Sequence, residues 1–258
     1  MASPDIITRT LNESRALVSI VTSCFVDLIV REAMYVPTGS DAELIDSYNQ
    51  TYAAHGLLNL RAFLYADLVR DAYATIGDNR ADSASVARLV TLFRQPGVAA
   101  AARAEYCRPR VHNWTEGSNL GTADEQRDFE KLLDAQEQTE AEQRFDTAHR
   151  EILHDWDKFV ASDLFRRIKE ARHKTIAHKG IQPTTDTRLW DLKDTGIQHG
   201  DCEKFIATAE PILVNLSLLL CNTGPGFDSA RKEYGKVAQG FWATCRAPKK
   251  GGLKEPTE

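Results

Sequence analysis

The chain has 258 residues, of which 42% are hydrophobic and 27% charged, with only 15 glycines and 9 prolines. This composition is typical of a globular protein and excludes fibrous and wholly disordered classes, and the length suffices to bury a core without metals or disulfides. The formal net charge of −5 argues against general electrostatic adhesion to nucleic acid, although it does not exclude a local basic patch.

The sequence shows no targeting or membrane signal. Charged residues interrupt the apolar positions of the first thirty residues, unlike a secretion signal. The longest apolar run, Ile212 to Cys221, is about half of the roughly 20 residues that a membrane-spanning helix needs. The five cysteines are scattered and form no Cys-x-x-Cys pair, so neither a disulfide framework nor a zinc knuckle is expected. We therefore expect a cytoplasmic protein that does not enter a membrane.

The first third of the chain predicts three helices. Ser3 and Pro4 are typical of a helix start, and apolar residues at helical spacing continue to about Met34. A break is expected at 37–39, after which the Ser-x-x-Glu pattern of 40–43 predicts the start of a second long helix that continues to Ile76. A third, shorter helix is expected from about residue 82 to before Pro96.

The middle of the chain begins with an alanine-rich segment, 98–106, that we expect to be helical, followed by a loop over 108–121. The Thr-x-x-Glu pattern of 122–125 predicts another helix start. No Gly or Pro follows until after Lys179, and a single helix of that length would span roughly 85 Å at about 1.5 Å per residue. We therefore expect a break or a projecting hairpin in the polar segment 137–143.

The last third predicts a helix end at Gly180 and Pro183, a loop to Gly200 and a strong helix from about Asp201 to Leu220, kinked at Pro211. No segment alternates apolar and polar residues as a strand does. The predicted fold class is therefore all-α: an elongated bundle of four to five long helices with short extra helices. We expect one domain over 1–245, with a projecting helical segment near 123–150, and a flexible tail over 246–258.

Most familiar enzyme motifs are absent. The glycines form no phosphate-binding loop, and the sequence contains no Gly-x-Ser-x-Gly or His-Glu-x-x-His. His149 and His154 are five residues apart, which turns them about 140° from each other on a helix, so two surface histidines are favoured over a metal site. Cys107 has a histidine nearby but no third orienting group, which makes it a weak candidate nucleophile. No cofactor and no metal are expected.

Two segments could contact nucleic acid. The first interleaves basic and aromatic residues that could stack on a single strand, although an ordinary surface loop is the simpler reading; these residues are Arg103, Tyr106, Arg108, Arg110, His112 and Trp114. The second is strongly basic: 166–179 contains six Lys or Arg and one Glu, whereas 122–163 contains thirteen Asp or Glu and five Lys or Arg.

The basic segment holds the best candidate site, Arg172 and His178. On a helix these residues would be rotated about 120° and separated by about 9 Å, so they would not touch, but the long arginine could bend towards the same groove. A histidine in the last helical turn before Gly180 is favoured as a cation by the helix dipole and is suited to acid–base work. The alternative is that both residues simply decorate a charged surface.

This pattern, Arg172, the polar His173, four more residues and His178, resembles the signature of the HEPN superfamily of all-helical domains, many of which are RNases. The segments 60–65 and 82–89 are similar to its abortive-infection U-type (AbiU-like) branch. The resemblance spans about residues 15–220 and implies a metal-independent endoribonuclease of a toxin or anti-phage type, in which the RNA 2′-hydroxyl attacks the adjacent phosphate.

The resemblance also implies roles for single residues. Arg172 would stabilise the charge on the phosphorane and His178 would move protons. His173 and Lys174 would support them, while three further basic residues, Arg167, Lys169 and Lys179, would bind the RNA backbone. The family usually places two copies of the motif across a dimer, which implies a homodimer.

Two other classes of function remain open. The protein could bind RNA or a nucleotide without cleaving it, or it could serve as a dimerisation module in a defence or toxin–antitoxin complex with an antitoxin or another partner protein. The sequence assigns no role to the acidic segment 137–151.

Overall fold

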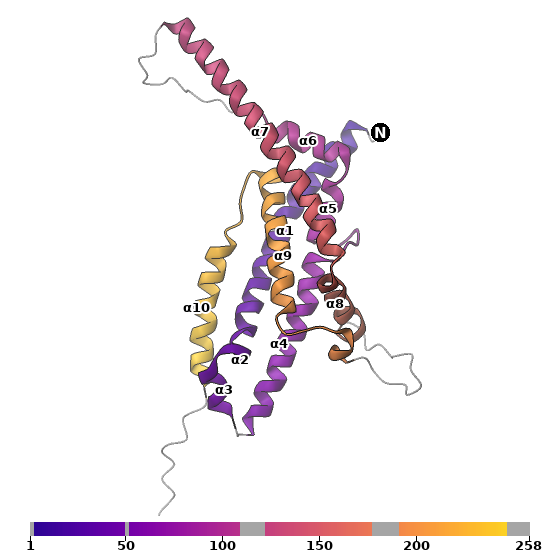
Figure 1. Cartoon of the computed structure of the whole chain (residues 1–258), viewed down its shortest axis with the longest axis vertical. Helices are drawn as coiled ribbons and strands as arrows, with labels where there is room; N and C mark the ends of the chain where they lie inside the picture. Colours follow the sequence, from indigo (N-terminus) through magenta and orange to yellow (C-terminus); the bar gives the residue numbers. More distant parts are fainter. Residues whose placement is uncertain (1–2, 50–51, 109–121, 177–190, 247–258) are drawn as a thin grey trace, which may run out of the picture. The chain divides into compact units, whose positions relative to one another are not determined.

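The computed structural model describes residues 3–49, 52–108, 122–176 and 191–246. Helices account for most of these residues and no strand occurs among them (Figure 1), so the predicted all-α class is confirmed. In chain order the elements are α1 (Pro4–Tyr35), α2 (Pro37–Ser40), α3 (Ala42–Tyr48), α4 (Ala53–Ile76), α5 (Val86–Phe93), α6 (Pro96–Tyr106), α7 (Ala123–Val160), α8 (Asp163–Ala171), the π-helical turn η1 (Arg172–Ile176), the 3-10 turn η2 (Leu192–Thr195), α9 (Asp201–Cys221) and α10 (Phe227–Cys245).

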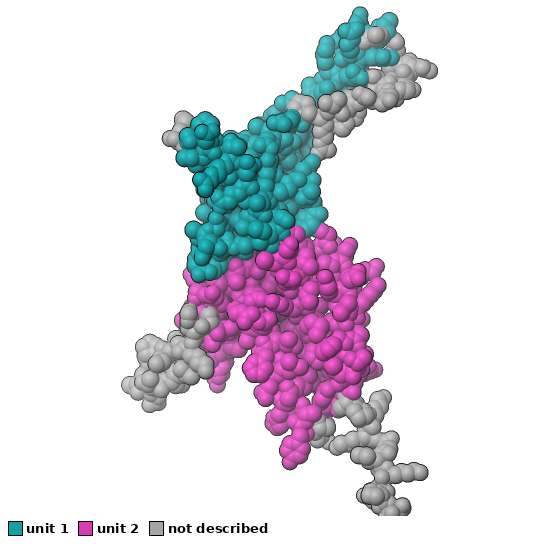
Figure 2. All heavy atoms as spheres, turned by 180° about the vertical axis from the view of Figure 1, so that it is seen from behind, with its two compact units in different colours: residues 1–21, 78–162, 208–225 teal, residues 22–77, 163–207, 226–258 magenta. Residues whose placement is uncertain are grey.

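The chain forms two compact units, coloured separately in Figure 2. Unit 1 comprises residues 1–21, 78–162 and 208–225, and unit 2 comprises residues 22–77, 163–207 and 226–258. The helices α1 and α9 each contribute residues to both units. The expectation of a single domain stays a prediction.

Unit 1 has an aromatic core where α5 and α6 meet α7. Phe93 and Phe145 pack edge to face with their ring centroids 6.1 Å apart, and the Tyr106 ring lies 5.7 Å from Phe145. On the surface, Arg103 of α6 pairs with Asp146 and Glu142 of α7. The aromatic contacts thus join all three helices, and the ion pairs add a second link between α6 and α7.

Unit 2 buries one face of α4 and of α8. Phe165 of α8 lies 5.5 Å from Phe205 of α9 and 6.1 Å from Tyr73 of α4, measured between ring centroids. A separate cluster forms where Leu44 of α3 meets Ala238 and Trp242 of α10. The first cluster thus joins α4, α8 and α9, and the second joins α3 and α10.

The start of the second predicted helix differs from expectation. Residues 37–39 were expected to be non-helical, but they belong to the short helix α2, whose first residue is Pro37. The cap of the next helix is Asp41 rather than Ser40, because the Asp41 carboxylate accepts a hydrogen bond from the Leu44 amide at 3.0 Å. The predicted long helix is in fact two, α3 and α4.

The predicted break at 137–143 is wrong, because α7 runs through it. This segment consists mainly of strong helix formers, and its polar side chains bond along the helix: Gln136 to Glu140 at 3.1 Å and Gln138 to Glu142 at 3.3 Å. The predicted start at Thr122 is correct, since the hydroxyl of Thr122 and the carboxylate of Glu125 form a reciprocal cap. The helix ends instead at Val160.

The helix α10 was not predicted at all. Its interior glycines, Gly235 and Gly240, lower its intrinsic helix propensity. Packing compensates, since Trp242 is 3% exposed and its indole Nε1 donates to the Met34 carbonyl at 2.9 Å. Tertiary contacts therefore stabilise a helix that local pattern does not indicate.

The helix α9 is apolar over more of its length than the run 212–221 suggests. By length and composition alone it could cross a membrane, and half of its most apolar window is buried in the structure. Phe205, Ile206 and Leu213 are fully buried, which is the pattern of a core helix. Pro211 lies inside this helix, and the kink expected there stays a prediction.

Candidate functional site

The candidate site lies in unit 2, where α8 passes into the π-helical turn η1. The buried face of α8 consists of Phe165, Ile168 and Ala171, which fixes the helix against its neighbours and presents the following residue, Arg172, at the start of η1. Short π-helical turns are rare and often mark functional sites. Arg172 therefore begins a π turn that follows a nine-residue helix. It does not lie near the end of one long helix, as predicted.

Arg172 is held in place by two aromatic side chains. Its Nη1 lies 3.1 Å from Nδ1 of His173, and its guanidinium carbon lies 5.7 Å from the centroid of the Tyr73 ring, within the range of a cation–π interaction. Its Nε atom is buried and has no hydrogen-bond partner in the described part of the chain. A buried N–H donor without an acceptor is costly, so this atom indicates a place for a ligand oxygen.

His173 contacts both Arg172 and Tyr73. A guanidinium group only donates hydrogen bonds, so Nδ1 of His173 is the acceptor in a hydrogen bond between these two side chains. The imidazole also packs against Tyr73 in a T-shaped arrangement, with centroids 5.3 Å apart. These two contacts orient the imidazole ring.

The other predicted basic residues have different surroundings. Lys174 pairs with Glu170 at 3.0 Å and thereby lowers the pKa of that carboxyl group. Arg167 is 16% exposed and engages Asp201 and Asp163, so carboxylates already occupy the guanidinium that was predicted to contact RNA. Lys169 is exposed and suits contact with a phosphate backbone.

Two predicted site residues, His178 and Lys179, lie outside the described residues. The expectation that Arg172 and His178 share a groove stays a prediction. The structure brings together Arg172, His173 and Tyr73, and of these Tyr73 was missed. It lies 99 positions before Arg172 in the sequence, on the apolar face of α4, and no local signal distinguishes it from an ordinary core residue.

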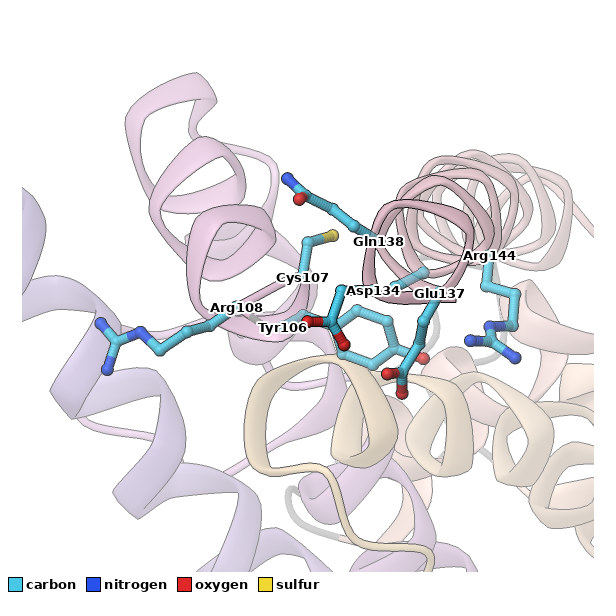
Figure 3. Close-up of a pocket in the computed structure, with 8 residues that line it drawn as sticks. Tyr106, Cys107, Arg108, Asp134, Glu137, Gln138 and Arg144 are labelled. Atoms are coloured by element: carbon cyan, nitrogen blue, oxygen red, sulfur yellow. The ribbon is translucent and has the colours of Figure 1, made fainter. Parts of the chain in front are cut away.

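A pocket of about 260 Å³ lies in unit 1, between the end of α6 and α7 (Figure 3). Its wall includes Cys107, Asp134, Glu137 and Arg144, and the Cys107 side chain points towards α7. Burial raises the pKa of the Cys107 thiol, which disfavours the thiolate needed for attack. The pocket thus gives no support to the weak prediction of a cysteine nucleophile.

The remaining candidates of the sequence do not form a site among the described residues. Arg103 is paired with acidic residues of α7. Arg110, His112 and Trp114 of the same segment lie outside the described residues. His149 is partly buried rather than on the surface as predicted, because its ring packs against Phe93 and Phe145, with centroids 5.0 and 6.0 Å away. His154 is exposed, and no group of three metal-ligating side chains occurs in the described ranges.

Comparison with known proteins identifies the family of the chain. No curated protein and no solved structure matches the chain significantly. One family model matches residues 43–241, about three quarters of the chain, and it covers α8, the π turn and Tyr73. The chain therefore belongs to the AbiU2 family of HEPN domains.

Proposed function

We propose that the protein is an endoribonuclease of a toxin or abortive-infection type, which cleaves RNA without a metal ion. The observation that carries this proposal is the state of Arg172, a permanent cation that is held by aromatic rings and whose buried Nε has no acceptor among the described residues. Such a donor suits a non-bridging phosphate oxygen, because a guanidinium fork matches phosphate geometry.

The reaction needs two proton transfers and one charged transition state. The 2′-hydroxyl loses its proton and attacks the adjacent phosphorus, the bond to the 5′-oxygen breaks, and that oxygen takes up a proton. The products are a 2′,3′-cyclic phosphate and a 5′-hydroxyl. In this proposal His178 transfers protons, Arg172 stabilises the phosphorane, and His173 supports them.

The charge around the site fits an RNA substrate that is bound by a homodimer of the protein. Lys169 on α8 is exposed, and it belongs to the segment 166–179, which carries six Lys or Arg and one Glu in a chain that is acidic overall. Two copies of the motif would double this charge and bind a longer stretch of backbone. We place the protein in the cytoplasm, where an antitoxin or defence partner would restrain it.

The test is cleavage of labelled RNA by the purified protein in the presence of a chelator. The parent protein should generate ends with a 2′,3′-cyclic phosphate, and His178→Ala should reduce the rate by a factor on the order of 10² or more, because proton transfer typically contributes 10²–10⁴. His154→Ala, which removes an exposed histidine of α7, is the matched control and should cut at the parental rate.

The same experiment distinguishes the endoribonuclease from the two non-catalytic alternatives. If the parent retards RNA on a gel but leaves its length unchanged, the protein is a binding module. If it neither cuts nor binds RNA, it acts as a dimerisation or partner module. Equal cleavage by the parent and His178→Ala would show that the catalytic assignment is wrong.

A further inference from the structure

The structure assigns Tyr73 as the positioning residue of the site, one that acts through Arg172 rather than on RNA. This inference rests on the proposed function. Tyr73 lies in the last turn of α4 and is 6% exposed, so its ring is fixed by packing. That ring meets both the guanidinium of Arg172, at 5.7 Å, and the imidazole of His173, at 5.3 Å.

The Tyr73 ring orients Arg172 without occupying its N–H donors, as a carboxylate partner would. Arg167, five residues earlier, is held by Asp201 and Asp163, and these carboxylates occupy its N–H donors and offset its charge. Arg172 has no carboxylate partner among the described residues, and its cation lies over the negative face of an aromatic ring instead. A π face orients the guanidinium and leaves its in-plane N–H donors available for phosphate oxygens.

The space for the ring depends on Gly77. A Cβ atom at Gly77 would lie 2.8 Å from Cε2 of Tyr73 and 3.1 Å from Cζ of Phe165, closer than side chains normally approach. The backbone of Gly77, with φ −102°, is open to any residue, so the requirement is for space rather than conformation. Gly77 and Phe165 therefore limit the space available to the Tyr73 ring, which also contacts Arg172 and His173.

The kinetic test varies the electrons of the ring while keeping its shape. Starting from Tyr73→Phe, phenylalanines with one, three and five ring fluorines are incorporated at position 73, which progressively removes the negative potential of the ring face. We expect kcat to fall stepwise, by about tenfold across the series, while KM stays within about twofold. Phe63 is an exposed aromatic residue on the same helix, 74% exposed, and the same series there should change neither constant.

A second measurement does not depend on activity. In the full-length protein, the Nε–Hε resonance of Arg172, assigned from its loss in Arg172→Lys, should be displaced by the Tyr73 ring current. It should move towards the position typical of free arginine in Tyr73→Leu, and a thermal melt should show that this variant is folded. Gly77→Ala should displace the same resonance, because the added methyl group pushes on the ring.

The outcomes separate the two proposals. A kcat that does not depend on fluorination, or an Arg172 resonance that is unmoved in folded Tyr73→Leu, overturns the positioning role even if RNA is cut. If the Arg172 resonance is displaced but the protein cuts no RNA, the proposed function is wrong. The contact between Tyr73 and Arg172 is then only structural, and the positioning role in catalysis is overturned as well.

Discussion

Arg167 and Asp201 form a two-pronged ion pair that joins α8 to the start of α9. Nε of Arg167 lies 2.9 Å from Oδ2 of Asp201, and Nη2 lies 3.1 Å from Oδ1. The Asp201 side chain is 2% exposed and also accepts a hydrogen bond from the Gln198 amide. The pair raises the pKa of Arg167, and it fixes the helix from which Arg172 extends.

We expect Asp201→Asn to destabilise the protein by about 3 kcal/mol, because the largely buried Arg167 loses its charged partner at Asp201 and keeps only the exposed Asp163. Urea unfolding followed by circular dichroism measures the loss. The matched control is Asp128→Asn, which removes the pair with Lys131, both of whose side chains are more than three quarters exposed, and should cost well under 1 kcal/mol. Equal losses in the two variants would contradict the structural role of Arg167.

A change at Arg172 should separate affinity from rate. Arg172→Lys keeps the positive charge but loses the planar fork that reaches His173 and a phosphate. We expect cleavage to fall on the order of 10²-fold while the Kd for RNA changes less than about threefold. Lys169→Ala should do the reverse, with weaker binding and a reduced dependence of log Kd on log salt. A matching loss of affinity in Arg172→Lys would show that this arginine mainly binds RNA.

The pH dependence of stability should report on His149. Burial against two phenylalanine rings lowers the pKa of this histidine, so the unfolded chain takes up a proton at a higher pH than the folded chain. The free energy of unfolding is therefore unaffected by this group above the ordinary histidine pKa near 6.5 and falls as the pH drops below it. Denaturant unfolding between pH 8 and pH 5 should show this decline.

The variants His149→Leu and His154→Gln test the assignment. His149→Leu should flatten the decline between pH 7 and pH 5, because the buried titrating ring is gone. His154→Gln, at an exposed position of α7, should keep the parental slope. A parental slope in His149→Leu would place the cause elsewhere.

Removal of the Trp242 side chain should test whether α10 is part of the folded unit. Trp242→Ala deletes a buried indole and its hydrogen bond to the Met34 carbonyl, and we expect a loss of about 3–5 kcal/mol. Phe241→Ala removes the adjacent ring, which is 47% exposed, and should cost about 1 kcal/mol or less. Thermal or urea unfolding distinguishes the two.

The sequence predicted the elements that carry strong local signals. The reciprocal cap at Thr122, the alanine-rich run within α6 and the apolar run within α9 are signals carried by residues that lie close together in the sequence. It did not predict α10, because this helix is stabilised by contacts with residues about 200 positions away, such as Met34. Similarly, the break expected within α7 did not occur, since side-chain bonds along that segment favour the helix.

The candidate site was predicted only in part, for the same reason. Arg172 and His173 were found because they belong to a short linear motif. Tyr73 could not be found in this way, because its role depends on the packing of α4 beside α8. The engagement of Arg167 with Asp201 also joins positions 34 residues apart, and the charge pattern of the basic segment gives no indication of it.

The π-helical turn η1 follows directly on α8 and is wider than a turn of α-helix. Its hydrogen bonds join residues five rather than four positions apart, so one turn takes up one extra residue. Deleting a single residue of η1, such as Thr175, would therefore let the turn close as ordinary α-helix without the rotation of about 100° that the loss of one residue causes within an α-helix. The consequence of such a deletion falls on the shape of the backbone at Arg172 itself.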